Sequence, residues 1–228
     1  MAAVIAFDVN ETLLDLHALD ATFEEVFGDP AVRGQWFAQM LQLSFVGGLT
    51  GQYVDFGTAQ RAALRMVAER LGHHVGAEQV DDIVGRMSTL PPHPEVPSAL
   101  DALRAAPLQV VALTNSVQDV AEAQLRNAGI AGYFDRIMSA DNVQRLKPAP
   151  EPYHAVARAF EVEPAQVRLV AAHSWDVSGA MAAGCQAAFV ARPGMVLSPI
   201  GGRPDIVEPD IAGVVRTILA VDAPAGDD

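Results

Sequence analysis

Short apolar runs alternate with segments of helical periodicity along most of this 228-residue chain, and this alternation limits the fold more than any other feature. The apolar runs are typical of buried strands and cover residues 2–7, 109–113, 136–139, 167–172 and 186–191. The helical patterns between them cover residues 96–104, 117–128, 152–160 and 177–183. Strands that alternate with helices form a parallel sheet with helices on both faces, so we expect an α/β fold.

Residues 16–90 break this alternation. Four segments there have helical patterns, and none is convincing as a strand; the four cover residues 19–27, 32–45, 53–71 and 79–87. A cluster of prolines between residues 91 and 97 marks the return to the sheet. We therefore predict an α-helical cap domain, residues 16–90, inserted into a Rossmann-like catalytic core of residues 1–15 and 91–228, with hinges at the two junctions.

Composition and charge limit where in the cell this protein is expected and which partners it can bind. Half of the residues are hydrophobic, so the chain can bury a large core. The net charge of -13 argues against binding to nucleic acid or anionic membranes, although a few local donors can still bind a small anion. No apolar run is long enough to cross a bilayer, and the single cysteine, Cys185, cannot form an internal disulfide. We expect a cytoplasmic protein with a frayed acidic tail at residues 223–228.

Polar side chains follow four of the predicted strands at the point where each strand ends. They are Asp8, Asn10 and Thr12 after the first strand, Thr114, Asn115 and Ser116 after the second, Lys147 after the third, and His173, Ser174 and Asp176 after the fourth. Any one of them could simply cap a helix. Because ligands bind at the carboxyl edge of an open parallel sheet, their convergence from four strands favours a catalytic site there.

These positions also carry a family resemblance. The segment Phe7-Asp8-Val9-Asn10-Glu11-Thr12-Leu13-Leu14 resembles the first motif of the haloacid dehalogenase superfamily. Leu113–Ser116, Lys147–Pro150 with Tyr153, and Val170–Asp176 resemble its second, third and fourth motifs, in the same order and with similar spacing. The chain is most similar to the type II 2-haloacid dehalogenase branch, whose members carry a helical cap in the place predicted here.

Two positions separate this chain from the phosphatases of the same superfamily. Those enzymes hold magnesium with the nucleophilic Asp, a nearby backbone oxygen and acidic groups of the fourth motif, and they use a second Asp as general acid. Here Asn10 stands at the general-acid position and cannot transfer a proton, and Ala172 stands at the first acidic position of the fourth motif. We therefore predict an enzyme without a metal or other cofactor. A phosphatase with unusual metal ligation and a catalytically idle binder of small carboxylates are the alternatives.

The expected pairing of Lys147 with Asp8 indicates which reaction the site can catalyse. Without a metal, Lys147 is the cation available to keep Asp8 ionised and to hold Asp176. An ionised carboxylate can displace a halide from carbon, which gives an ester on Asp8 that water hydrolyses. A halide leaves as a stable anion, so the reaction needs no general acid at Asn10. The predicted function is hydrolytic dehalogenation of a short 2-haloalkanoic acid, with a small halocarboxylate as substrate.

The resemblance assigns further roles to individual residues. Thr12 would position Asp8, and Tyr153 would support Lys147. Thr114 and Asn115 would bind the substrate carboxylate or the departing halide, and Asn10 is counted with them as a substrate-binding residue. Phe56 either lines the halide side of the site or packs in the core of the cap. Because related enzymes are often homodimers, a homodimer is the assembly that the resemblance suggests.

The cap departs from the branch at one position. Characterised 2-haloacid dehalogenases have an Arg where this chain has Phe37, and that Arg meets the substrate and the halide. Arg33, one helical turn earlier, could lean into the same space, and Arg61 is a weaker candidate. The remaining alternative is a small apolar pocket formed by Trp36, Phe37 and Phe56 that selects compact substrates.

The fourth motif departs as well, because His173 stands where the branch has Asn. A histidine beside Asp176 could be the base that activates the hydrolytic water. It could also be a neutral hydrogen-bond donor that replaces the Asn side chain, and this is the role that we slightly favour.

Overall fold

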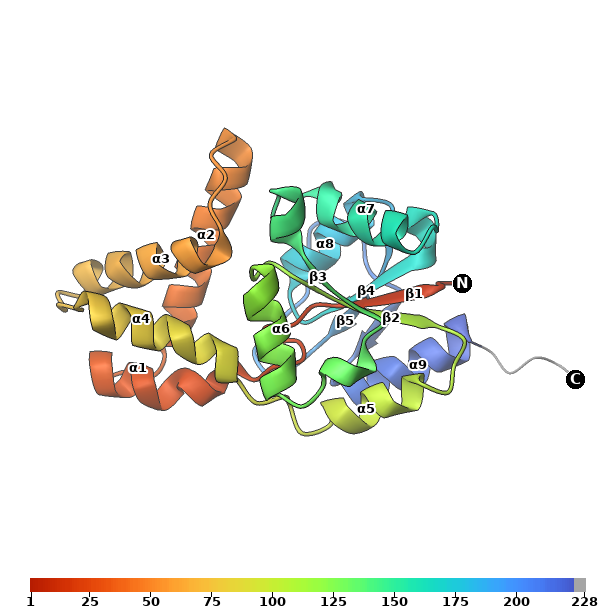
Figure 1. The fold of residues 1–228 in the computed structure, drawn as a ribbon, viewed down its shortest axis with the longest axis horizontal. Helices are drawn as coiled ribbons and strands as arrows, with labels where there is room; N and C mark the ends of the chain where they lie inside the picture. Colours follow the sequence, from red (N-terminus) through yellow and green to blue (C-terminus); the bar gives the residue numbers. More distant parts are fainter. Residues whose placement is uncertain (224–228) are drawn as a thin grey trace, which may run out of the picture.

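A computed structural model describes residues 1–223, so residues 224–228 of the predicted acidic tail lie outside the described part of the chain. The core is a six-stranded parallel sheet with the strand order β3-β2-β1-β4-β5-β6 (Figure 1). Its strands are β1 (Val4–Phe7), β2 (Gln109–Thr114), β3 (Arg136–Ser139), β4 (Val167–Ala171), β5 (Gln186–Val190) and β6 (Ile206–Glu208). The α/β fold with a parallel sheet is thus confirmed.

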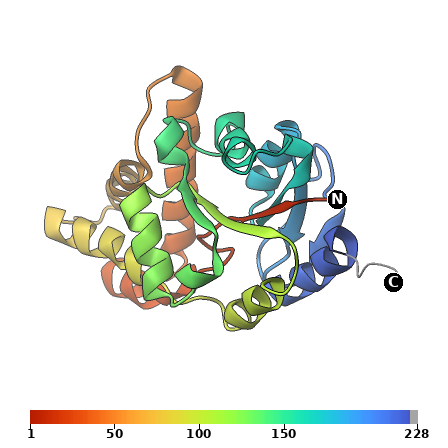
Figure 2. The same cartoon turned by 45° about the vertical axis from the view of Figure 1, so that its right-hand side comes forward.

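Helices cover both faces of the sheet. They are α5 (Val96–Leu103), α6 (Gln118–Asn127), α7 (Pro150–Ala159), α8 (Ser174–Ala182) and α9 (Ile211–Asp222). Figure 2 shows α7 and α8 on one face and α5 and α9 on the other. Two buried hydrophobic clusters correspond to the two faces, because the side chains of β1 alternate between them.

The position of β1 at the centre of the sheet explains where the polar residues meet. Phe7, the last residue of β1, is level with Ala112 of β2 and Val170 of β4. The residues that follow these three therefore leave the sheet at the same height, along one edge.

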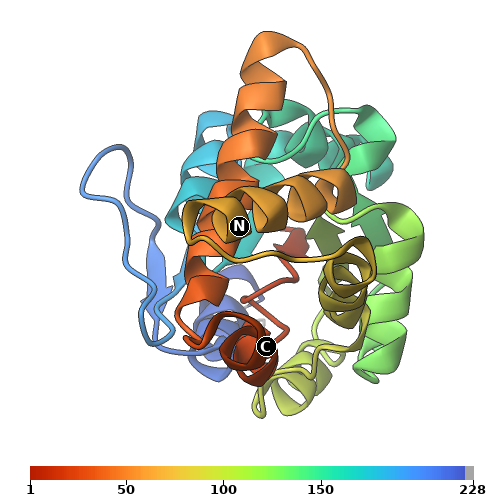
Figure 3. The ribbon, with the colours of Figure 1, turned by 90° about the vertical axis from the view of Figure 1, so that its left-hand side faces the viewer.

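Residues 16–90 form helices and loops without a strand and lie at that edge. The helices are α1 (Asp20–Phe27), α2 (Val32–Thr50), α3 (Phe56–Arg70) and α4 (Ala77–Gly85), with short 3₁₀ helices at Leu16–Leu19 and Arg86–Thr89. Figure 3 looks onto this helical insert, with the ends of β1 and β2 behind it. The division of the chain into two domains at residues 15/16 and 90/91 stays a prediction.

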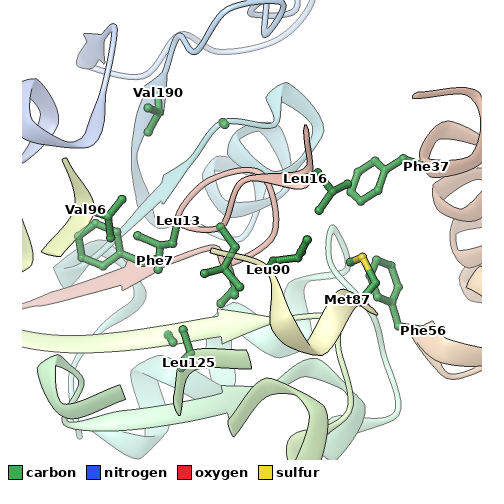
Figure 4. Close-up of a cluster of buried hydrophobic side chains, with 14 of the residues drawn as sticks. Phe7, Leu13, Leu16, Phe37, Phe56, Met87, Leu90, Val96, Leu125 and Val190 are labelled. Carbon is green, nitrogen blue, oxygen red and sulfur yellow. The ribbon is translucent and has the colours of Figure 1, made fainter. Parts of the chain in front are cut away.

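The two connections between the helical insert and the sheet are hydrogen-bonded to each other. The amide of Asp15 donates to Pro91 O over 2.8 Å, and the amide of His93 donates to Leu13 O over 2.9 Å. A single hydrophobic cluster also continues from Phe7 in the sheet through Leu16 to Phe56 in the insert (Figure 4). The insert and the sheet thus share apolar packing.

The structure differs from the sequence expectations in three places. Strand β6 and helix α9 were not expected, because a Gly- and Pro-rich loop precedes a strand of only three residues. Helix α2 continues to Thr50, five residues beyond the expected end. Helix α3 begins at Phe56 and not at residue 53, because the Asp55 side chain caps it by accepting the amide of Thr58 over 2.9 Å. No helix of residues 1–223 has the length and apolar character needed to span a membrane.

Candidate active site

Asp8 follows β1 directly and is held by two neighbouring side chains. Its Oδ1 accepts a hydrogen bond from Lys147 Nζ over 2.7 Å, and its Oδ2 accepts one from Thr12 Oγ1 over 2.7 Å. Thr12 Oγ1 in turn accepts the amide of Ala172 over 2.9 Å, which ties the Asp8 loop to the end of β4. The carboxylate is therefore fixed in orientation before any substrate arrives.

Lys147 is fully buried and uses all three of its N–H groups. Besides Asp8, its Nζ donates to Asp176 Oδ2 over 2.6 Å and to the Leu113 carbonyl over 2.9 Å. Burial lowers the pKa of Lys147, but the two carboxylates outweigh it and the net pKa lies above its ordinary value. Lys147 is thus a permanent ammonium ion between two carboxylates.

Asp8 and Asp176 respond differently to this arrangement. Burial raises the pKa of Asp8, but Lys147 and His173 together hold it well below its usual range, so Asp8 is an anion at neutral pH. Burial and the nearby charge of Asp8 raise the pKa of Asp176 against the opposing effect of Lys147. The negative charge is therefore favoured on Asp8, which follows β1 at the carboxyl edge of the sheet, over Asp176.

Tyr153 supports the other side of Asp176. Its hydroxyl donates to Asp176 Oδ1 over 2.5 Å, and burial and the Asp176 charge raise its pKa well above the ordinary value, so it remains a donor. Gly179 of α8 permits this contact, because a Cβ there would lie 2.5 Å from Pro148 Cβ and 2.8 Å from the Tyr153 hydroxyl oxygen. Helices α7 and α8 therefore approach closely at this point.

His173 lies on the other side of Asp8, between two aromatic rings. Its Nδ1 is 3.2 Å from Asp8 Oδ2 and its Nε2 is 2.8 Å from Glu11 Oε2. Its ring stacks on Phe37 and on Trp175, with centroids 5.6 Å and 5.2 Å away. Burial lowers the pKa of His173, but the two carboxylates raise it to about 9, so the imidazole is protonated in the resting enzyme.

Asn115 and Thr114 hold the loops in place. Asn115 Oδ1 accepts the amide of Lys147 over 2.8 Å and its Nδ2 donates to the Lys147 carbonyl over 3.2 Å. Thr114 Oγ1 accepts the amide of Ser116 over 3.2 Å. Sequence reasoning did not predict that Asn115 clamps the backbone of Lys147, and its substrate-binding role stays a prediction.

The side chain of Asn10 is hydrogen-bonded to helix α6. Its Oδ1 accepts Gln124 Nε2 over 2.9 Å, and its Nδ2 lies 3.4 Å from Ser116 Oγ. Gln124 Nε2 also donates to the Met87 carbonyl over 2.8 Å, which links the Asn10 loop to the end of the helical insert. Both polar atoms of the Asn10 amide are thus bound within the protein.

The candidate residues of the helical insert make different contacts with the rest of the protein. Phe37 reaches the site through its stacking on His173. The guanidinium of Arg33 pairs with Asp20 and Glu11. Phe56 is buried in the hydrophobic cluster and lines a cavity of about 300 Å³ together with Arg61 and Ser116, and Arg61 also pairs with the exposed Asp81. Their roles towards the substrate stay predictions.

Glu11 is the site residue that sequence reasoning missed. It has a φ of 61°, in the left-handed region that a residue with a Cβ rarely adopts. This backbone turn brings its carboxylate to His173. The signal available in the sequence was an acidic residue three positions after Asp8, within the first motif.

A cavity of about 360 Å³ lies beside His173. Glu11, Phe37 and Trp175 contribute to its wall, and so does Met195 in the loop after β5. Within residues 1–223, no group of three or more His, Cys, Asp or Glu side chains is arranged to hold a metal ion. The site thus offers an anionic carboxylate, a buried ammonium ion and an imidazolium ion beside a largely apolar cavity.

Comparisons with known proteins agree with this geometry. The haloacid dehalogenase-like hydrolase family matches residues 2–184. An (S)-2-haloacid dehalogenase of Xanthobacter autotrophicus is 31% identical over 197 residues, which are 84% of this chain and 76% of that protein. Haloacetate dehalogenase H-2 of Moraxella sp. (strain B) is 28% identical over 216 residues, which are 94% and 96% of the two chains.

A solved structure extends the similarity to the whole fold. The L-2-haloacid dehalogenase of Xanthobacter autotrophicus with chloropropionic acid covalently bound superposes with a TM-score of 0.90. The match has 26% sequence identity and covers 97% of this chain and 100% of that one. The resemblance expected from the four motifs is confirmed: the chain belongs to the haloacid dehalogenase-like hydrolase family, and it is a hydrolase.

Proposed function

We propose that the chain is a hydrolytic dehalogenase of short 2-haloalkanoic acids and that its nucleophile is the carboxylate of Asp8. The observation that carries this proposal is the ion pair of Asp8 with Lys147 at 2.7 Å, which keeps the nucleophile ionised in a buried site. Two relatives are named as dehalogenases of haloacetate and of (S)-2-haloacids, and these names support the choice of substrate. The covalent chloropropionic acid in the similar structure supports a covalent route.

The first half-reaction is a displacement at carbon. One Asp8 oxygen attacks the carbon that bears the halogen, the new carbon–oxygen bond forms, and the halide departs with the bonding electrons. Thr12 and Lys147 restrain the carboxylate so that it meets the carbon in one orientation. No proton transfer is required, which is consistent with the bound amide of Asn10.

Metal independence is part of the proposal. The Lys147 ammonium lies between Asp8 and Asp176, at 2.7 Å and 2.6 Å, and supplies positive charge between the two carboxylates. Ala172 offers no side-chain ligand, and Asn10 is bound to Gln124. These donors do not match the several oxygen ligands that magnesium requires.

The second half-reaction is ester hydrolysis, for which His173 is the proposed base. Ester formation removes the negative charge of Asp8, so the pKa of His173 falls and its Nδ1 proton passes to solvent. The neutral Nδ1 then accepts one proton of a water molecule as the water oxygen attacks the ester carbonyl carbon. The bond between that carbon and the substrate oxygen breaks, the departing alkoxide takes the other proton of the water, and the 2-hydroxy acid leaves Asp8 as a carboxylate and His173 as an imidazolium. Glu11, 2.8 Å from Nε2, orients the ring and stabilises the imidazolium that forms.

The helical insert is proposed to be the cap that closes this site. It lies over the carboxyl edge of the sheet (Figure 3), and its Phe37 covers the His173 ring. An apolar cover of this kind favours a compact substrate and excludes bulk water from the ester. A cytoplasmic location and a homodimer remain predictions from the sequence.

Isotope labelling tests the covalent route. A single turnover of chloroacetate in oxygen-18 water should place one oxygen-18 in the Asp8 carboxylate, because water attacks the ester carbonyl, and none in the carboxylates of other residues. Peptide mass spectrometry locates the label, and Asp8→Asn serves as the inactive reference. Oxygen-18 in the hydroxy acid after one turnover, with none in Asp8, would contradict the proposal.

A release assay tests the reaction class. Chloride, bromide and fluoride release from 2-haloacids is compared with phosphate release from phosphate monoesters, each with and without EDTA. Halide release that EDTA leaves unchanged supports the proposal. Phosphate release that EDTA abolishes would identify the chain as a phosphatase with unusual metal ligation, and no release of either kind would indicate an idle binder.

A further inference from the structure

Arg33 joins the helical insert to the loop that carries the catalytic groups. It lies near the start of α2 and is buried, and its Nε donates to Asp20 Oδ1 over 2.5 Å. Its Nη1 is 3.3 Å from Glu11 Oε1. The insert thus places a guanidinium ion against the core residue that contacts His173.

The resulting row of charged groups alternates in sign. Glu11 binds Arg33 through Oε1 and His173 through Oε2, and the other nitrogen of His173 faces Asp8. The φ of 61° at Glu11 holds this residue in a strained conformation, as occurs where the surrounding structure imposes a functional geometry. The shared Glu11 carboxylate is therefore the link between the insert and the imidazole.

We propose that Arg33 is a positioning residue that prepares His173 to act as a base when the helical insert covers the site. This inference rests on the proposed ester mechanism. Arg33 competes with His173 for the Glu11 charge, so its presence weakens the hold of Glu11 on the imidazole proton. Because Arg33 belongs to the insert and Glu11 to the core loop, this effect operates only while the two are in contact.

The other charges around His173 stay the same whether or not Arg33 is present. Asp8 faces Nδ1, and Lys147 and Asp176 lie behind Asp8, all of them on the core. The neighbours on the ring faces, Phe37 and Trp175, carry no charge. Asp20 acts through Arg33, since it takes part of the guanidinium charge. Changes at Arg33 and Asp20 should therefore move the proton affinity of His173 in opposite directions.

The test measures ester decay as a function of pH in single-turnover experiments with chloroacetate. Rapid quenching and mass spectrometry follow the mass added to the Asp8 peptide, and halide release gives the rate of ester formation in the same reaction. Arg33→Gln should move the inflection of the decay rate to higher pH. A shift of one pH unit would slow decay about tenfold on the rising limb and leave halide release much less affected.

Three variants separate charge from structure. Arg33→Lys keeps the charge and should keep the wild-type inflection even if it lowers the melting temperature. Asp20→Asn frees Arg33 for Glu11 and should move the inflection to lower pH. Arg86→Gln makes the same charge change at the exposed Arg86–Asp82 pair of the insert and should leave the profile unchanged.

The outcomes are distinct. If Arg33→Gln and Asp20→Asn shift the inflection in the same direction, or if Arg33→Gln leaves it unchanged, Arg33 has only a structural role and the inference is wrong. If the wild-type protein forms no ester on Asp8, the proposed function itself fails. Should Arg33→Gln not fold, a wild-type inflection in Asp20→Asn would overturn the inference.

Discussion

Replacement of Lys147 by Met would leave two carboxylates buried without their ammonium partner. Methionine keeps the length and apolar character of the side chain, so the change isolates the charge from the packing. Each Lys147–carboxylate contact, at 2.6–2.7 Å, contributes about 6 kcal/mol of attraction at an effective dielectric constant of 20, and desolvation of the three ions opposes it. Loss of one partner from a buried ion pair costs about 3–5 kcal/mol, which is the expected destabilisation at pH 8.

The sign of the pH dependence follows from the pKa directions. In the wild-type protein the pKa of Asp8 is held low, so its contribution to stability is present above the unfolded value of 3.8 and is lost only as the pH falls below it. Without Lys147, burial and the Asp8 charge raise the folded pKa of Asp176 further, and only His173 still opposes the burial that raises the pKa of Asp8. The penalty is then present at pH 8 and relieved as the pH falls through the raised values, so the variant should lose less stability at pH 5.

Guanidinium unfolding followed by tryptophan fluorescence at pH 5 and pH 8 measures both effects. Arg86→Met, which breaks the exposed Arg86–Asp82 pair, is the control and should change stability by less than about 0.5 kcal/mol. A loss below about 1 kcal/mol for Lys147→Met at pH 8 would refute the reasoning, because it would mean that the carboxylates do not need the ammonium ion. So would an equal loss at the two pH values.

Three further changes test other parts of the site. His173→Asn removes a group whose pKa is raised from 6.5 to about 9; its stabilisation is complete below pH 6.5 and lost as the pH rises through 9. Unfolding titrations should therefore show a loss of about 2–4 kcal/mol between pH 6 and 10 in the wild type and a flatter curve in the variant. Gly179→Ala should cost about 1–3 kcal/mol and slow halide release, because its Cβ meets Pro148 and Tyr153, whereas Gly85→Ala has open space and should not destabilise. Glu11→Gln removes negative charge from His173, so the inflection of ester decay should move to lower pH; a shift to higher pH would count against the proposed base.

The sheet and the position of Asp8 at its edge could be predicted because both follow from local pattern, whereas the role of Asp8 as nucleophile stays a prediction. The alternation of apolar runs and helices determines parallel strands, and parallel strands end along one edge. Asp8 stands directly after β1 and Asp176 shortly after β4, so their meeting follows from the register of these two strands. Lys147 lies beyond a 3₁₀ helix that follows β3, and it was placed at the same edge by the order of the strands and by the third motif. The motif resemblance added Tyr153, whose hydroxyl indeed contacts Asp176.

Contacts that depend on side-chain direction could not be predicted in this way. The position of Glu11 depends on a left-handed backbone conformation, which strand and helix periodicity do not encode. The bonds from both ends of the Asn115 amide to the Lys147 backbone were not predicted, and the substrate contact predicted for Asn115 stays a prediction. Strand β6 was missed because three residues after a Pro- and Gly-rich loop are too few to show a period.

The paired connections between the sheet and the helical insert have a mechanical consequence. Leu13 is hydrogen-bonded to His93 and Asp15 to Pro91, so the two connecting segments would have to bend together. Hinge motions between parts of a protein are absorbed by a few residues at such connections. Glu11 lies on the sheet side of these two connections and Arg33 lies in the insert. A rotation of the insert would therefore separate these two charges, while Asp8 and Lys147 keep their places.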